Sequence, residues 1–576
     1  MSDNRNMILA FALSLLIWFG WSFASERFFP QPKRPTTAAV VAGAGTPQNS
    51  SPTIPAAPGE IPAAAGADAV RPLAVVAAET PRLRIDTPRL LGSLNLKGAR
   101  VDDLVLKTYS QTIDKASPPV RLFSPSGTTD AYFAQFGWAG VGAPGADTVW
   151  TASGPVLTPT TPVTLSWTNP AGAVFEIVLS VDDHWLFTAK QRVRNAGPTP
   201  LTVRSYGLVG RTGIGHETDA NNLHVGPLGV VNGKLMDTEV AYKKLRDNGA
   251  QSLSSTGGWL GITEKYWLAA VIPDQASPVA MRFSANPGDR FQTDYLAGPV
   301  TVAPGATVET TARLFAGAKE VETLTRYRDT FGIPLFERAV DWGWFRVIAQ
   351  PIYMLLDFLF KLTGNFGVAI IGLTLCVRAL MFPIAQRQFA SMAKMRVVAP
   401  RLKELQERYK DDKPKLQSEM MALYAKEKVN PVAGCLPIFI QIPVFYALYK
   451  TLLISTEMRH QPFILWIKDL SAPDPVTPLN LFGLIPWTPP HMIALGVLPI
   501  ILGVTMWLQQ RLNPAVMDPV QKQVFAFMPW VFMFIMAPFA AGLQLYWIIN
   551  NIISIAQQYV MLRKYPMPAT PTVAAP

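Results

Sequence analysis

The stretch FGVAIIGLTLCVRALMFPI (366–384) decides the fold class of this chain. It approaches the length of about 20 apolar residues that crosses the hydrocarbon core of a bilayer, so it predicts a transmembrane helix. Its one charged residue is Arg378. Further apolar stretches follow at 435–455, 492–508, 524–540 and 543–562. Residues 366–564 therefore predict a polytopic α-helical core with five membrane spans.

A sixth apolar stretch, MILAFALSLLIWFGWSF (7–23), lies near the N-terminus. Its aromatic end suits the membrane interface, which favours a retained transmembrane anchor at 1–29. A cleaved signal peptide is the alternative, because Ser22-Phe23-Ala24 resembles a cleavage site. Residues 30–80 are rich in Pro and Ala and predict a disordered tether. The expected fold thus has six transmembrane helices.

Residues 81–330 have the alternating pattern of β-strands. Runs such as VFEIVLSV (174–181) and LTVRSYGLV (201–209) are separated by Gly, Pro, Asn and Asp turns. This pattern predicts a large all-β sandwich domain. Residues 331–365 then mix aromatic residues with spaced charges, which predicts an amphipathic helix lying in the membrane interface.

The charges of the loops predict the orientation in the membrane. Residues 385–430 hold an excess of Lys and Arg over Asp and Glu, whereas the loop 456–491 has only Arg459 and Lys468 as basic residues. Because positive loops stay inside, residues 385–430 and the short tail 565–576 are expected in the cytoplasm. An even number of spans also places the N-terminus inside. The β domain is then periplasmic if the cell is Gram-negative.

The cytoplasmic segment has its own pattern. Apolar residues recur roughly every 3.5 positions in 385–430, which predicts a helical hairpin with a basic face. It is either a solvated hairpin without a partner or a docking platform for lipid headgroups, nascent chains or the ribosome. Flexible methionine side chains suit contact with varied apolar segments. The candidate contact residues are Met392, Met395, Arg396, Lys403, Met420 and Met421.

Arg378 is the most informative residue for function. An arginine at the centre of a span costs about 2.5–3.5 kcal/mol on insertion scales and is tolerated when it faces water or a partner. Thr374 lies one helical turn earlier on the same face. Other spans carry the polar residues Gln441, Asn550 and Asn551, and no predicted span contains Asp or Glu.

A cation among neutral hydrogen-bonding groups predicts a water-filled groove. Two alternatives stay open: Arg378 snorkels to the cytoplasmic headgroups, or it belongs to a closed polar cluster that only packs helices. A hydrated cationic groove would hold a polar or acidic segment of an incoming polypeptide briefly. The flanking apolar segment would meanwhile enter the lipid.

The sequence shows no sign of catalysis. It has no P-loop, GxGxxG or HExxH motif, and its two cysteines, Cys376 and Cys435, form no CxxC pair. We therefore predict no catalytic residue, metal site or cofactor. One alternative is an anion-coupled small-molecule transporter, although no repeat of spans is visible. Another is a carbohydrate enzyme that would use His184, His216, Glu217 and His224 of the β domain.

Several long motifs resemble the YidC/Oxa insertase family, of the Gram-negative type. The clearest are TLCVRALMFP (374–383), SMAKMRVVAPRLKELQERYKDDK (391–413), EMMALYAKEKVNPVAGCLPIFIQIPVFYALY (419–449) and GLQLYWIINN (542–551). The resemblance implies a membrane protein insertase and chaperone of the bacterial inner membrane. It also implies a β domain like the galactose-mutarotase supersandwich.

The resemblance further implies a site and partners. The site is a cationic groove open to the cytoplasm and the lipid, and the partners are nascent membrane proteins, the Sec translocon, ribosomes and the phospholipid bilayer. Ribosome contact would rest on the cytoplasmic loops, because the tail 565–576 is short and uncharged. The groove residues carried over are Arg378, Thr374, Gln441, Asn550 and Asn551, with substrate-contacting aromatics Phe445, Tyr446 and Tyr546.

Overall fold

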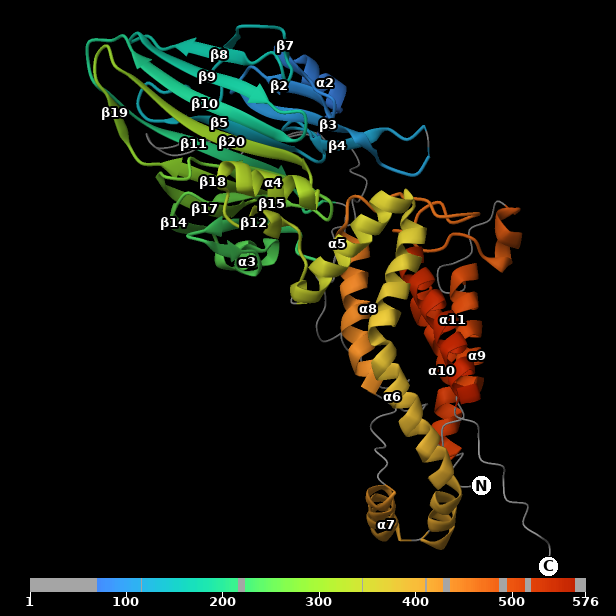
Figure 1. Cartoon of the computed structure of the whole chain (residues 1–576). Coiled ribbons are helices and arrows are strands. Elements are labelled where there is room, and N and C mark those ends of the chain that lie inside the picture. Colours follow the sequence, from blue (N-terminus) through green and yellow to red (C-terminus); the bar gives the residue numbers. More distant parts are fainter. Residues whose placement is uncertain are drawn as a thin grey trace, which may run out of the picture.

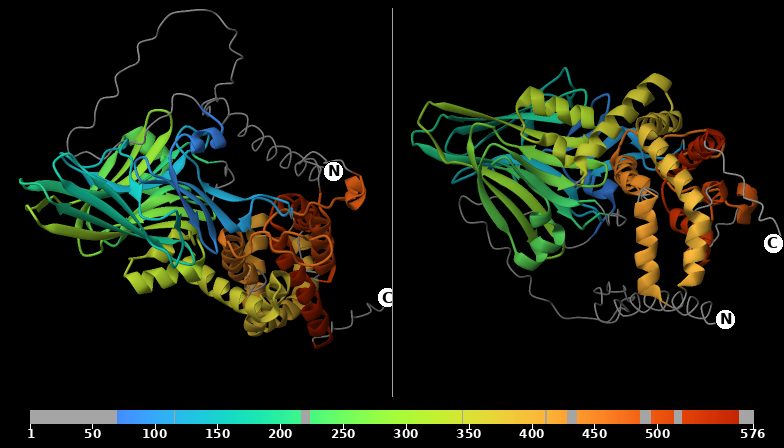
Figure 2. Two further views of the ribbon diagram at one scale, coloured as in Figure 1. Left: turned by 90° about the horizontal axis from the view of Figure 1, so that it is seen from above. Right: turned by 60° about the horizontal axis from the view of Figure 1, so that its bottom comes forward.

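The computed structural model describes residues 70–114, 116–215, 223–343, 345–409, 412–427, 436–485, 495–512 and 519–564. The predicted anchor at 1–29, residues 30–69 of the predicted tether (30–80) and the tail 565–576 lie outside these residues. The prediction of disorder is wrong for the end of the tether, where residues Leu73–Ala78 form helix α2 and the Arg71 N–H donates to the Gly127 carbonyl at 2.8 Å. Figure 1 shows two parts, one built of strands and one of long helices. Figure 2 shows the same arrangement from two further directions.

The first sheet of the β domain runs in the order β14-β17-β18-β11-β5-β3-β2-β1-β7, with β19 paired to β11 and β4 paired to β3. Its pairings are antiparallel except that β1 runs parallel to β7. The strands are β1 (Arg82–Asp86), β2 (Leu90–Asn95), β3 (Arg100–Ser110), β4 (Pro119–Phe123), β5 (Tyr132–Ala139), β7 (Val156–Leu157), β11 (Leu201–Thr212), β14 (Gln251–Thr256), β17 (Pro278–Asn286), β18 (Arg290–Ala297) and β19 (Val300–Val302).

The second sheet runs in the order β13-β12-β15-β16-β20-β10-β9-β8-β6. Its strands are β6 (Thr151–Ala152), β8 (Val163–Thr168), β9 (Ala173–Val181), β10 (Leu186–Asn195), β12 (Gly226–Val231), β13 (Lys234–Met236), β15 (Trp259–Thr263), β16 (Trp267–Ile272) and β20 (Thr307–Ala318). Short helices accompany the sheets: α2 (Leu73–Ala78), η1 (Thr238–Val240), α3 (Tyr242–Asn248), α4 (Val321–Phe331) and η2 (Phe336–Ala339).

The burial of the strands follows the alternation of the sequence. In β9 every second side chain is buried, whereas β5 and β16 are buried along their whole length. Trp185, Trp259 and Phe315 are among the largest fully buried side chains of the core. Burying such residues removes large apolar areas from water, which is the main favourable contribution to folding. The prediction of a β-sandwich domain is confirmed.

The helical part begins with α5 (Arg346–Thr363) and α6 (Phe366–Arg408), which meet at a sharp turn. Gly364 ends α5 in the left-handed conformation, and the Asn365 side chain accepts a hydrogen bond from the Val368 N–H at the start of α6. Such Gly C-caps and Asn N-caps satisfy helix ends. The remaining helices are α7 (Lys413–Lys426), α8 (Leu436–Ile454), η4 (Pro478–Gly483), α9 (Val497–Leu512), α10 (Pro519–Met536) and α11 (Ala541–Lys564).

Helix α11 is central to the helical part, because it contacts α6, α8 and α9, while α5 packs on α6 and α8. The composition changes from apolar to basic at residue 384, which predicts a boundary between the span 366–384 and the hairpin 385–430. The backbone does not change there: α6 continues through Pro383 and Pro400 to Arg408. Helix α7 then lies beside the far end of α6 (Figure 1).

Within the described residues, one helical segment, Phe366–Gln386, is long and apolar enough to cross a membrane by itself. Shorter apolar segments occur at Gln441–Ile454, Val497–Leu512 and Phe525–Met536. The number of six spans therefore stays a prediction.

Replacing Gly317 by alanine should destabilise the β domain. A Cβ atom at Gly317 would lie 2.5 Å from the Trp185 ring, which is fully buried and cannot move away. Overpacking of this kind costs about 1–3 kcal/mol. We expect a clear fall in the thermal midpoint of the full chain in detergent. The control is Gly145→Ala, because Gly145 has open space around its Cβ position. Equal midpoints for the two variants would contradict this packing.

Candidate functional site

Arg378 of α6 reaches across to α11 and binds uncharged oxygen atoms. Its Nε donates to Asn550 Oδ1 at 2.7 Å, and its Nη2 donates to the Asn550 carbonyl at 3.2 Å and to Ser554 Oγ at 2.5 Å. Asn550 and Ser554 are buried, while Arg378 stays partly exposed. These contacts orient the guanidinium without cancelling its charge. Ser554 is not among the predicted groove residues, although its spacing of four residues from Asn550 places both on one helix face.

A second contact joins α8 to the same face of α11. Gln441 Nε2 donates to Tyr546 Oη at 2.6 Å. Tyr546, Asn550 and Ser554 follow one another at intervals of four residues, so they form a polar row along α11. This row faces Arg378 on α6 and Gln441 on α8. Three of the five groove residues carried over from the family thus lie along one continuous polar strip.

The other two groove residues do not join this strip. Thr374 is fully buried and donates to the carbonyl of Ile370 in its own helix at 2.7 Å. Asn551 donates to Thr505 Oγ1 of α9 at 3.1 Å. A residue adjacent to Asn550 points about 100° away around the helix, which explains its different neighbour.

The aromatic residues predicted to contact substrate pack against protein. The Phe445 ring lies 4.8 Å from the Trp547 ring, edge to face, and the Tyr446 ring lies 5.3 Å from the Phe345 ring. Tyr546 is almost fully buried. These contacts give the three rings fixed positions; their contact with substrate stays a prediction.

The remaining candidate residues fall into two groups. The side chains of Met392, Met395, Arg396 and Lys403, and residues His216 and Glu217, lie outside the described part of the structure. Among the described ones, Met421 is 60% exposed and Met420 is partly exposed. His224 is close to a backbone group, with its Nε2 2.8 Å from the Pro227 carbonyl. Burial lowers the pKa of His224.

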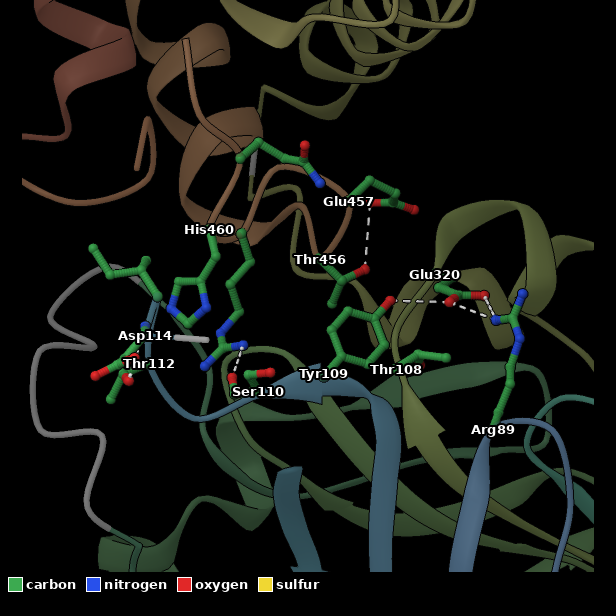
Figure 3. A pocket seen from close by; sticks show the side chains of 13 residues that line it. Arg89, Thr108, Tyr109, Ser110, Thr112, Asp114, Glu320, Thr456, Glu457 and His460 are labelled. Carbon is green, nitrogen blue, oxygen red and sulfur yellow. Dashed lines mark hydrogen bonds and ion pairs between the residues drawn. The ribbon is translucent and has the colours of Figure 1, made fainter. Parts of the chain in front are cut away.

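A polar cavity that the sequence did not reveal lies at the junction of the two parts (Figure 3). Its volume is about 480 Å³. The β domain contributes Arg89, Tyr109 and Glu320, and the loop after α8 contributes Glu457, Arg459 and His460. These residues are far apart in the sequence, so no local pattern could have grouped them.

Arg459 ties this loop to the β domain. Its guanidinium donates to the carbonyls of Ser110 at 2.7 Å and Gln111 at 3.2 Å, at the end of β3. It also lies over the rings of Tyr266 and Trp267, 5.6 and 5.4 Å from their centroids. Hydrogen bonds and cation–π contacts from one guanidinium therefore join the helical part to both sheets.

Glu457 ties the same loop to α5. Its carboxylate accepts hydrogen bonds from Tyr353 Oη at 3.0 Å, Ser455 Oγ at 2.9 Å and Thr456 Oγ1 at 3.3 Å. Glu457 lies at the edge of the polar cavity and is partly buried, and this burial raises the pKa of Glu457.

Comparisons with known proteins agree with this architecture. A family model described as the YidC periplasmic domain matches residues 82–355, and one described as the 60Kd inner membrane protein matches residues 358–568. The membrane protein insertase YidC of Zymomonas mobilis is 46% identical over 98% of this chain and 96% of its own length. The chain belongs to the YidC family of membrane protein insertases. The resemblance seen in the sequence motifs is confirmed.

Other known proteins also match this chain over most of its length. The YidC of Methylobacterium nodulans is 47% identical over 98% of this chain and 95% of its own length. A crystal structure of an active YidC insertase with its first transmembrane domain resolved covers 83% of this chain and 92% of its own. Its identity with this chain is 16% and its TM-score is 0.37. Family membership makes the chain an inner-membrane protein whose β domain is periplasmic.

Replacing Glu457 by glutamine should stabilise the protein above acidic pH. Because the pKa of Glu457 is raised in the folded state, the carboxyl group binds its proton more tightly there than in the unfolded chain. Its contribution is most favourable at acidic pH and is lost as the pH rises through the folded-state pKa. A tenfold difference in proton affinity between the two states is worth about 1.4 kcal/mol. The thermal midpoint of Glu457→Gln should therefore exceed that of wild type by more at pH 8 than at pH 5.

The matched control for this measurement is Glu309→Gln, which removes an exposed carboxylate paired with Arg192. It should change the midpoint by a similar, small amount at both pH values. A gain for Glu457→Gln that does not depend on pH would contradict the effect of burial on this group.

Proposed function

We propose that the chain inserts and helps to fold integral membrane proteins through a hydrated groove around Arg378, open to the cytoplasm and the lipid. The observation that carries the proposal is the guanidinium of Arg378, placed in an apolar helix and bound by uncharged oxygens of Asn550 and Ser554. The activity itself is that of the family to which the chain belongs.

The positive charge attracts the substrate. The neutral oxygens around Arg378 satisfy its donors on one side but bring no negative charge, so a net cation remains beside a polar strip. Two unit charges 4 Å apart attract by about 4 kcal/mol at an effective dielectric constant of 20. This attraction is strong enough to hold an acidic or polar segment briefly and weak enough to release it.

The transfer needs no nucleotide or covalent step. While the polar segment pauses beside Arg378, the apolar segment next to it leaves the protein for the lipid. That step is favourable, because burying each CH₂ group in an apolar medium gains about 0.8 kcal/mol. The membrane potential adds about 2.3 kcal/mol per negative charge moved outward at 100 mV.

The topology that supports this function has six spans and two cytoplasmic termini. The basic composition of residues 385–430 supports a cytoplasmic position for the end of α6 and for α7. In this arrangement Met420 and Met421 of α7 face nascent chains, lipid headgroups or the ribosome. Helix α5 exposes Val347, Met354, Phe358 and Leu362, which supports its position in the membrane interface.

The partners beyond the nascent substrate are part of the same proposal. The chain acts alone or together with the Sec translocon, and it receives chains from ribosomes through its cytoplasmic loops. No observation favours the anion-coupled transporter, since the relatives are named as membrane protein insertases.

Reversing the charge at Arg378 tests the proposal. Arg378→Glu should lower the insertion of a single-span, Sec-independent substrate into proteoliposomes by at least tenfold, because the groove then repels acidic segments. Tenfold corresponds to about 1.4 kcal/mol. Arg378→Lys keeps the charge and should retain part of the rate. The measurement is protease protection of the translocated tail.

The control is Arg511→Gln at the end of α9, where the arginine is exposed and lies over the Trp507 ring. It should insert the substrate at the wild-type rate. Insertion by a folded Arg378→Glu protein at the wild-type rate would exclude the groove as the site of transfer.

A further inference from the structure

The segment that leads from the β domain to α5 passes very close to α8. Gly343 has a φ of +65°, and a Cβ atom there would lie 3.2 Å from Lys450 Cε and 3.3 Å from Tyr446 Oη. Since residues other than glycine rarely adopt this φ, both the backbone conformation and the small available space favour glycine at this position. The periplasmic part is therefore in direct contact with a helix of the core.

Asp341 makes the polar connection at this point. Its Oδ2 accepts hydrogen bonds from the His224 N–H at 3.1 Å and from Lys450 Nζ at 3.2 Å, and its Oδ1 accepts one from the Gly343 N–H at 2.9 Å. One carboxylate thus joins the β domain, the connecting segment and α8. The Lys450 side chain is only 2% exposed.

The carboxylate is ionised in this environment. Burial alone would raise the pKa of Asp341, but the Lys450 ammonium and the two N–H donors outweigh burial and hold it below its usual range. Lys450 is buried whereas the Asp341 side chain is 29% exposed, so removal of the carboxylate leaves the Lys450 ammonium buried without this counter-charge.

Lys450 and Gln441 hold α8 on opposite sides. They are nine residues apart, which is two and a half turns of an α-helix at 3.6 residues per turn. Lys450 binds the connecting segment, whereas Gln441 binds Tyr546 on α11. Two polar contacts on opposite faces fix the rotation of a helix about its axis better than apolar packing alone, because apolar contacts have no direction.

We propose that Asp341 is a positioning residue for insertion. By pairing with Lys450 it fixes the rotation of α8, so that Gln441 keeps its place beside the polar strip of α11. The inference deepens the proposed function and rests on it for its effect on insertion. It also gives the periplasmic domain a physical connection to the groove, since the His224 N–H binds the same carboxylate.

The test combines a geometric measurement with the insertion assay. Ile442 of α8 and Leu375 of α6 are 56% and 53% exposed, so a cysteine at either position reports on its own helix. Each is introduced into a full-length chain whose two cysteines, Cys376 and Cys435, are replaced by serine. The labelling rate with a membrane-permeant maleimide is then measured in proteoliposomes.

The reference for each measurement is the same cysteine variant with Asp341 intact. Relative to it, Asp341→Asn should change the labelling rate at Ile442→Cys at least threefold and leave the rate at Leu375→Cys within twofold. It should also lower insertion at least fivefold. The control Asp357→Asn removes a carboxylate that pairs with Lys361 at 2.9 Å on α5, where Lys361 is 58% exposed. Because water can solvate that lysine, both readouts should stay within twofold of the reference.

The double variant Asp341→Asn/Lys450→Met separates positioning through Lys450 from other effects of Asp341. Replacing both members of a buried ion pair is often nearly neutral, so both readouts should return to within twofold of the reference. A double variant as impaired as Asp341→Asn would overturn the proposal, because Asp341 would then act through its contacts with His224 and Gly343 and not through Lys450. Unchanged labelling at Ile442→Cys in Asp341→Asn would overturn it as well.

Failure of the proposed function would look different. In that case Arg378→Glu would insert substrate normally, while labelling at Ile442→Cys would still respond to Asp341→Asn. The labelling rate needs no substrate, so it judges the position of α8 independently of insertion.

Discussion

A charged side chain among apolar helices must have its hydrogen-bond donors satisfied, and the type of partner decides what the charge can still do. Two cations of the helical part illustrate this constraint. Lys450 meets the carboxylate of Asp341, so its charge is cancelled locally. Arg378 meets the neutral oxygens of Asn550 and Ser554, so its charge remains. The first arrangement holds the protein together, and the second leaves an electric field for a substrate.

Helix α11 makes this arrangement possible. It contacts α6, α8 and α9, and its row of Tyr546, Asn550 and Ser554 supplies polar partners to the first two. Asn551 on the adjacent face serves α9 through Thr505. A single helix thus divides its polar residues between the candidate groove and helix packing. One alternative for these polar residues was a closed cluster that only packs helices. Asn551 fits that alternative, whereas Arg378 stays partly exposed.

Much of the architecture follows from the sequence because it depends on local periodicity. The alternation in β9 and the apolar run at 366–384 each decide an element without help from distant residues. Arg378 could be chosen because a cation within an apolar run is rare. Lys450 also lies within an apolar helix, but it is close to the end of α8, so it resembles an ordinary flanking charge. Its partner Asp341 is more than a hundred residues away, and only the fold brings the two together.

The orientation of side chains was harder to predict than their position along the chain. Thr374 shares a face with Arg378 but donates to its own helix backbone, and the Glu457 and Arg459 contacts join segments from across the sequence.

The length of helix α6 has a further consequence. At 1.5 Å per residue its 43 residues extend about 65 Å, twice the thickness of the hydrocarbon core. The helix that carries Arg378 therefore extends well beyond the length needed to cross that core, and its distal part, after Pro383, belongs to the segment whose basic residues predict a cytoplasmic position.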